Sequence, residues 1–179
     1  MRAVVQRSLL VAACTLLLAT SGVAQSVQLS VGGGAAVPTG KLRDTEKSGW
    51  LGQVVVTYGI GESPVGFRID GVYTELTHKS GAPGKTKVRG VTGDLVLQVA
   101  GETMKPYLLA SVGVYRVSVD SGQAVPLGVT RLALGLGGGL SFGIGSASLF
   151  LEGRFMTVAT SGSHTKFFPL TAGLSFSLW

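Results

Sequence analysis

The sequence predicts an all-β protein, an eight-stranded antiparallel up-and-down transmembrane β-barrel that follows a signal peptide. Three observations carry this prediction: an unusual composition, a repeated two-residue alternation, and connections that alternate between long and short. Of 179 residues, 28 are glycine and only 13% are charged, whereas soluble chains average about 7% glycine and about 25% charged residues. The mean hydropathy of +0.44 excludes a disordered chain. The glycines show no three-residue period, which excludes collagen.

The first residues have the three parts of a secretory signal peptide. Arg2 and Arg7 supply a basic start, Leu9–Ala19 is an apolar run, and Ser21–Ala24 offers small residues for cleavage. The apolar run is shorter than the roughly 20 residues of a membrane-spanning helix. We therefore expect residues 1–24 to be removed.

The remaining chain, residues 25–179, is expected to form one barrel domain. It contains no cysteine, because the single cysteine of the chain is Cys14. Disulfides and thiolate chemistry are thereby excluded from the barrel. The segment Val11–Cys14 resembles a lipobox, so lipidation of Cys14 is an alternative to simple cleavage.

Apolar residues or glycines alternate with other residues in eight segments, which we expect to be strands. These segments span residues 27–37, 50–60, 65–74, 91–99, 107–115, 131–142, 148–155 and 168–178. Their length of roughly ten residues is enough to cross a bilayer when the strands tilt. Amphipathic helix patterns are nearly absent.

The connections between these segments discriminate between kinds of barrel. They are expected to contain about twelve, four, twelve, four, ten, five and eight residues, so that long and short connections alternate. A transmembrane barrel has short turns at one end and long loops at the other. Eight strands enclose a lumen that side chains fill, which excludes a wide pore.

The charged residues of the strands fall on the face opposite to the apolar one. They are Arg68, Asp70, Asp94, Arg131, Glu152 and Arg154. We expect them to form a structural polar network inside the lumen, because buried charges need paired partners. A soluble, lipocalin-like barrel that binds a small apolar ligand is the alternative, and it requires the reverse arrangement of faces.

Two pairs of aromatic residues have the spacing of membrane girdles. Trp50 and Tyr58 are eight residues apart on one strand, as are Tyr107 and Tyr115. Eight residues span roughly 26 Å along a strand, or about 20 Å across the membrane after tilting. We therefore expect these four rings to lie at the two membrane interfaces.

Four segments resemble the small outer-membrane β-barrel family of the OmpX and OmpA-transmembrane-domain type. They are Ala36–Gly40, Lys105–Tyr107, Phe150–Phe155 and Phe168–Phe176. The resemblance implies an integral outer-membrane protein of a diderm bacterium, exported and then inserted by the outer-membrane assembly machinery. It further implies contact with outer-membrane lipid and lipopolysaccharide and a role in envelope integrity, adhesion or loop-mediated binding. Nucleic acid is not an expected partner.

The second long loop and the strand after it are basic. Lys79, Lys85, Lys87 and Arg89 follow His78 closely in the sequence. Our hypothesis is that these cations contact anionic lipid headgroups or surface polysaccharide. The alternative is an ordinary solvated loop.

The sequence predicts no catalytic residues, no metal site and no cofactor. Some small barrels modify lipid A with serine and histidine, and Ser161, Ser163 and His164 are close together here. However, no neighbouring carboxylate could orient His164 as a catalytic triad requires. The two histidines of the chain, His78 and His164, are too isolated for a metal centre.

Overall fold

A computed structural model describes residues 25–40, 42–60, 63–79, 85–120, 128–160 and 163–178. The predicted signal peptide and Cys14 lie outside the described residues, so the cleavage and lipidation expectations remain predictions. Within those ranges, no helix is long and apolar enough to cross a membrane.

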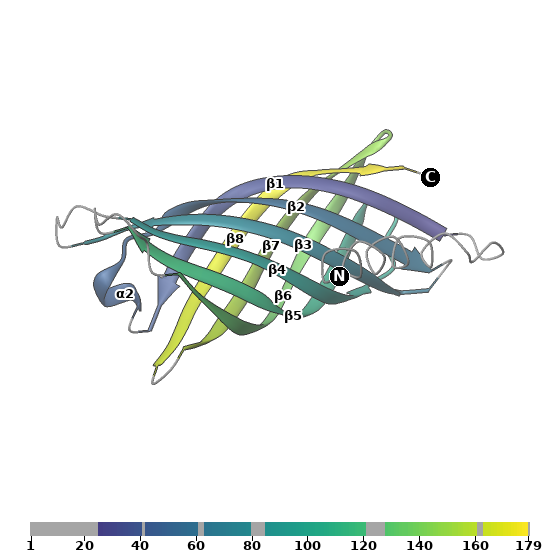
Figure 1. The fold of residues 1–179 in the computed structure, drawn as a ribbon. Coiled ribbons are helices and arrows are strands. Elements are labelled where there is room, and N and C mark those ends of the chain that lie inside the picture. The colour runs from purple at the N-terminus through teal and green to yellow at the C-terminus, as the bar shows by residue number, and fades with distance from the viewer. Residues whose placement is uncertain are drawn as a thin grey trace, which may run out of the picture.

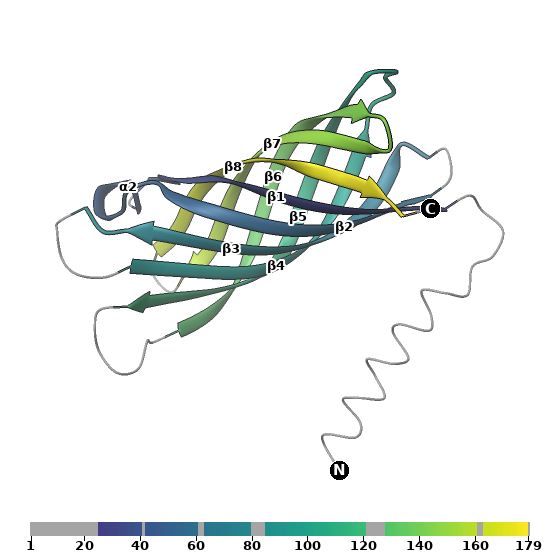
Figure 2. The same ribbon diagram turned by 90° about the horizontal axis from the view of Figure 1, so that it is seen from above.

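Eight antiparallel strands form one closed barrel, as predicted (Figures 1 and 2). Each strand pairs with its neighbours in sequence, and β1 closes the barrel by pairing with β8. The strands are β1 (Gln25–Thr39), β2 (Gly49–Ile60), β3 (Val65–Thr77), β4 (Lys85–Gln98), β5 (Met104–Asp120), β6 (Gly128–Ile144), β7 (Ala147–Thr160) and β8 (Ser163–Ser177). Closure leaves no sheet edge with unpaired amide groups, which is the condition for strands to cross lipid.

The strands are longer than the sequence pattern predicted, with 12 residues in β2 and 17 in β5. The predicted alternation of long and short connections is therefore wrong at the last position. There, β7 and β8 leave only residues 161–162 between them, where about eight residues were expected. The reason is that strand pairing continues past the apolar part of both strands, from Ala159↔His164 to Thr160↔Ser163.

The two ends of the barrel differ. Residues 40–48, 78–84, 121–127 and 161–162 connect strands at one end, which we call the loop end. Residues 61–64, 99–103 and 145–146 connect strands at the other end, the turn end. The short helix α2 (Leu42–Thr45) lies at the loop end, on the left in Figure 1.

The outer wall is apolar and the inner wall carries the charges. Among the described residues, 24 large hydrophobic side chains are exposed, and Leu136 and Ile69 are the most exposed of them at 69% and 61%. By contrast, Asp70 is completely buried and Arg154 is only 3% exposed. This arrangement of faces is the reverse of the one that a soluble lipocalin-like barrel requires, so that alternative is wrong.

The interior is filled in layers. Toward the loop end lies an apolar layer that consists of Ala36, Leu76, Val88, Tyr115, Ala133, Met156, Val158 and Phe167, with Leu42 of α2 packed against it. The charged residues occupy the middle of the barrel. Toward the turn end there is a small cavity of about 80 Å³, partly lined by Ser30, Gln98 and Ser175. This apolar layer lies in the loop-end half of the lumen, and a barrel of eight strands is too narrow for a wide pore.

Candidate functional site

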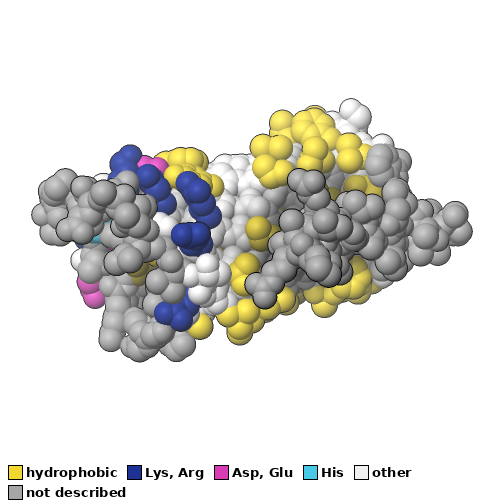
Figure 3. All heavy atoms as spheres, in the orientation of Figure 1, with side chains coloured by type: hydrophobic (Ala, Val, Ile, Leu, Met, Phe, Trp, Pro, Cys, Tyr) yellow, Lys and Arg dark blue, Asp and Glu magenta, His cyan; other side chains and the backbone are white. Residues whose placement is uncertain are grey.

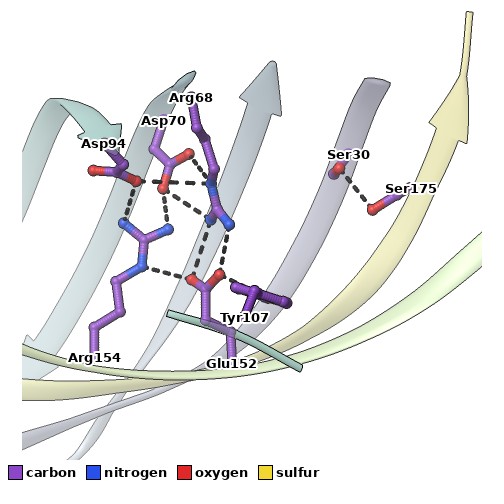
Figure 4. Close-up of polar contacts among 8 residues, drawn as sticks. All are labelled: Ser30, Arg68, Asp70, Asp94, Tyr107, Glu152, Arg154 and Ser175. Atoms are coloured by element: carbon purple, nitrogen blue, oxygen red, sulfur yellow. Dashed lines mark hydrogen bonds and ion pairs between the residues drawn. The ribbon is translucent and has the colours of Figure 1, made fainter. Parts of the chain in front are cut away.

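Arg68, in the middle of the barrel, binds two carboxylates from opposite walls (Figure 4). Its Nε donates to Oδ1 of Asp70 at 2.7 Å, and its Nη1 donates to Oε2 of Glu152 at 2.6 Å. Arg68 and Asp70 belong to β3, whereas Glu152 belongs to β7. The ion pairs thereby connect two strands that face each other across the lumen.

Arg154 of β7 joins the same group of charges. We call Arg68, Asp70, Asp94, Glu152 and Arg154 the lumen cluster. The Nε of Arg154 donates to Glu152 at 2.5 Å and its Nη1 donates to Asp94 of β4 at 3.0 Å, while Nη2 binds Asp70. Two guanidinium groups are thus shared among three carboxylates, all less than a tenth exposed. Mutual pairing is what makes charges tolerable in such a buried place. The lumen cluster joins opposite walls of the barrel through these ion pairs.

Five of the six predicted lumen charges meet in this cluster, and Arg131 does not. Arg131 lies on β6 and is register partner to Tyr115, closer to the loop end. Tyr107, which was expected at a membrane interface, joins the lumen cluster instead, because its hydroxyl donates to Oε2 of Glu152 at 2.9 Å.

The prediction that Tyr107 and Tyr115 belong to the aromatic girdles is wrong. Both side chains lie inside the barrel, with exposed fractions of only 7% and 2%. Tyr115 packs edge-on against Phe167, at 6.0 Å between ring centroids. The cause is that both faces of β5 are largely apolar, and the face toward lipid is the one that carries Leu108.

The other predicted pair lies on the outward face of β2. Trp50 is 55% exposed near the loop end, and Tyr58 follows eight residues later near the turn end. Tyr73 of β3, which was not predicted as a girdle residue, packs against Trp50 at 5.2 Å between ring centroids. Aromatic rings near one end of the outer wall, such as those of Trp50 and Tyr73, are typical of a membrane interface.

Three of the four predicted surface cations share one strand face. Lys85, Lys87 and Arg89 alternate along β4, and Arg116 of β5 is the register partner of Arg89. We call these four residues the basic stripe. It lies at the loop end of the outer wall, where Lys and Arg side chains gather in Figure 3.

The neighbours of the basic stripe hold it in place. The Arg89 guanidinium lies 5.4 Å from the ring centroid of Tyr73, a cation–π geometry. The Nζ of Lys85 is 2.5 Å from Oε1 of Glu75 on β3. Arg116 was not predicted, because it is far from Arg89 in the sequence. Only the pairing of β4 with β5 brings the two residues together.

Lys79 lies apart from the basic stripe. Its ammonium group donates to the backbone carbonyl of Arg43 in α2. Close by, Glu46 accepts a 2.9 Å hydrogen bond from Thr86 and lies 3.5 Å from Nε2 of His78. These contacts fasten the segment after α2 to β3 and β4, where it helps to cover the barrel mouth.

The remaining chemical candidates do not assemble into a site. Ser161 and the side chains of Ser163 and His164 lie outside the described part of the chain. Among the side chains that the structure does describe, no group of three His, Cys, Asp or Glu residues could hold a metal ion.

A closed wall, an apolar exterior and a charged lumen cluster together define a small transmembrane β-barrel. No protein-family model matches the chain, and no curated protein matches it either. Solved structures match it in fold. Neisserial surface protein A is 20% identical with a TM-score of 0.62, and the match covers 87% of this chain and 99% of that one.

Two further barrels match at similar length. The attachment invasion locus protein Ail of Yersinia pestis, solved with the heparin analogue sucrose octasulfate, is 17% identical with a TM-score of 0.53, over 85% of this chain and 97% of that one. The N-terminal β-barrel domain of Pseudomonas aeruginosa OprF is 11% identical with a TM-score of 0.54, over 88% and 100%. The fold of this chain is thus that of the small outer-membrane β-barrels.

Proposed function

We propose that the protein is an integral outer-membrane barrel whose loop end faces outward and binds anionic groups on glycolipids or surface glycans. The basic stripe carries the proposal, because it places four cations side by side at the loop end of the outer wall, with one carboxylate, that of Glu75, paired to Lys85. Anionic headgroups attract such cations with about 1 kcal/mol for each Lys or Arg near the surface. A structurally similar barrel, Ail, was solved with a heparin analogue, which supports a polyanion as the class of ligand.

The proposed role is binding at the surface rather than transport or catalysis. Transport is disfavoured by the lumen cluster and the apolar layer above it. Catalysis is disfavoured because the described histidine, His78, contacts Glu46 in a segment that caps the barrel. Intact lipid A after incubation with the purified barrel is the expected result, and a deacylated or acylated product would contradict this part of the proposal.

Binding to vesicles that contain a phosphorylated glycolipid tests the function. Replacing Lys87, Arg89 and Arg116 together with glutamine should weaken binding about a hundredfold. Binding by the unchanged protein should also weaken as salt rises, because salt screens exposed charges. Lys105→Gln is the matched control, since Lys105 is an exposed cation at the turn end of β5. Equal binding by the triple variant and the wild type would contradict the proposal.

A further inference from the structure

The outer wall has a groove that begins at the basic stripe and extends from it toward the turn end. It has a volume of about 660 Å³ and is lined by residues of β1 to β6. Gly52 and Gly71 are among its lining residues, together with Val54 and Val91. Figure 3 shows a patch of white surface between the dark blue cations and the yellow hydrophobic side chains.

Strand register places the two lining glycines, Gly52 and Gly71, beside a third glycine, Gly33, next to the groove. Gly33 of β1 is the register partner of Gly52 of β2, and Gly71 of β3 is the partner of Val54, two residues further along β2. All three glycines have the outward phase of their strands, like the exposed Val31 and Val54. At these positions of three adjacent strands, no side chain projects from the outer wall.

Internal packing does not require these glycines. An added Cβ atom would find its nearest neighbour at 3.5 Å for Gly33, 3.7 Å for Gly52 and 3.9 Å for Gly71, all ordinary contact distances. Gly153, on the outward face of β7, differs because the Phe168 ring would lie 3.0 Å from its Cβ and already covers it. The groove is thus open surface that side chains of this chain leave uncovered.

Two arginines stand at the loop-end edge of the groove. Arg89 lies two residues before Val91 on the same face of β4, and Arg116 lies two residues after Val114 on the same face of β5. Register pairs Arg89 with Arg116 and Val91 with Val114. One end of the groove is therefore cationic, whereas the rest is lined mostly by glycine and valine.

We propose that this groove holds an acyl chain of a phosphorylated glycolipid of the outer leaflet, with a phosphate bound by Arg89 and Arg116. The inference rests on the proposed function, which places the loop end outward. An outer-leaflet lipid would have its phosphate at the depth of the two arginines and its acyl chains nearer the middle of the membrane. The groove has the same order, because its arginines lie at the loop end and its apolar residues lie further toward the turn end. An inner-leaflet lipid would present its headgroup at the turn end instead.

Charge also argues against a second copy of this chain as the occupant. Two copies in one membrane keep the same orientation, so a two-fold axis would run along the membrane normal. Arg89 and Arg116 of both copies would then meet at the same depth, and like charges repel. A phosphate neutralises the same arginines, since Arg binds phosphate in a bidentate manner.

Native mass spectrometry of the purified barrel tests the proposal with an acylated, bis-phosphorylated glucosamine disaccharide as the probe. The wild type should retain one probe molecule per chain. Gly52→Leu with Gly71→Leu should lower its retention at least about tenfold, the loss expected when roughly two methylene groups lose their buried contact. The deacylated form of the probe should bind both proteins equally, because the basic stripe is intact in both.

Gly143→Leu is the matched control, because a Cβ at Gly143 meets nothing within 4 Å and this residue lies near the turn end. Heat-dependent migration on a gel verifies that each variant is folded. Equal retention of the acylated probe by the double glycine variant would overturn the groove proposal, and so would a wild-type dimer that this variant abolishes. Unchanged binding of the deacylated probe by Arg89→Gln with Arg116→Gln would instead overturn the proposed function.

Discussion

The two faces of the barrel wall use glycine for opposite reasons. On the inner face, a Cβ at Gly90 would lie 2.5 Å from the Tyr115 ring, and one at Gly139 would lie 2.5 Å from the Tyr107 ring. These contacts are too close for any side chain, so the glycines make room for two large residues. On the outer face, a Cβ at Gly71 would lie no nearer than 3.9 Å to its surroundings.

This difference shows what fixes each residue in a small transmembrane barrel. Inside, the close-packed lumen specifies volume and charge, because each side chain meets another one across a narrow space. Outside, lipid accepts any apolar shape, and only polarity is constrained. The same substitution should therefore change the free energy of unfolding differently on the two faces. Pairs of variants, one on each face, test this difference.

The largest difference is expected for arginine. Arg154→Met leaves three carboxylates of the lumen cluster to share Arg68 alone, and breaking a buried ion pair in this way costs about 3–5 kcal/mol. Arg116→Met, on the exposed rim, should change the free energy of unfolding by no more than about 0.5 kcal/mol. Urea unfolding of the barrel in phospholipid vesicles measures both. Equal losses for the two variants would show that the lumen cluster does not stabilise the barrel.

A smaller difference is expected for an arginine introduced on the outer face at two depths. Leu134 is 58% exposed on β6, and Leu134→Arg should cost about 2–4 kcal/mol because it places a charge in the bilayer interior. Thr130→Arg, on the same face of β6 but opposite Arg116, should cost only about 0–1 kcal/mol. Folding yield in liposomes, measured beside unfolding in urea, separates the two positions. A loss for Thr130→Arg as large as that for Leu134→Arg would contradict the assigned depth.

Most of the fold could be predicted from the sequence because alternation has a physical cause in β3, β4, β6 and β7. In the middle of these strands one face must satisfy lipid and the other a crowded polar lumen, so apolar and charged residues separate there, and outward charges such as Lys87 and Arg89 occur only near the loop end. Strand β5 has no charge in its middle, and alternation alone could not orient it. The available signal for the inward face of β5 was Ser111, the polar residue in the middle of the strand. It is buried on the same face as Tyr107 and Tyr115, whereas Leu108 and Val112 on the other face are exposed.

The candidate site was less predictable, because register creates it. Arg89 and Arg116 are far apart in the sequence and become neighbours only through the pairing of β4 with β5. The groove depends on Gly52 and Gly71, which alternation places on the apolar face, but only strand register shows that they line one groove. Conversely, Lys79 was predicted with the other cations from proximity in the sequence, yet it binds a carbonyl of α2 instead.

The smallest expected effect is also the sharpest test of the glycine comparison, because the same change should have opposite signs on the two faces. Gly90→Ala adds one methyl group against the Tyr115 ring, and such overpacking should destabilise the barrel by about 1–3 kcal/mol. Gly71→Ala adds the same methyl group where nothing obstructs it, and it removes the entropic cost of glycine in a strand, a gain of about 0.5–1 kcal/mol. Unfolding in urea, with each variant compared with the wild type in the same vesicles, measures both signs. Destabilisation by Gly71→Ala would mean that the outer wall is packed against something after all, and stability unchanged by Gly90→Ala would mean that Tyr115 has room to move inside the lumen.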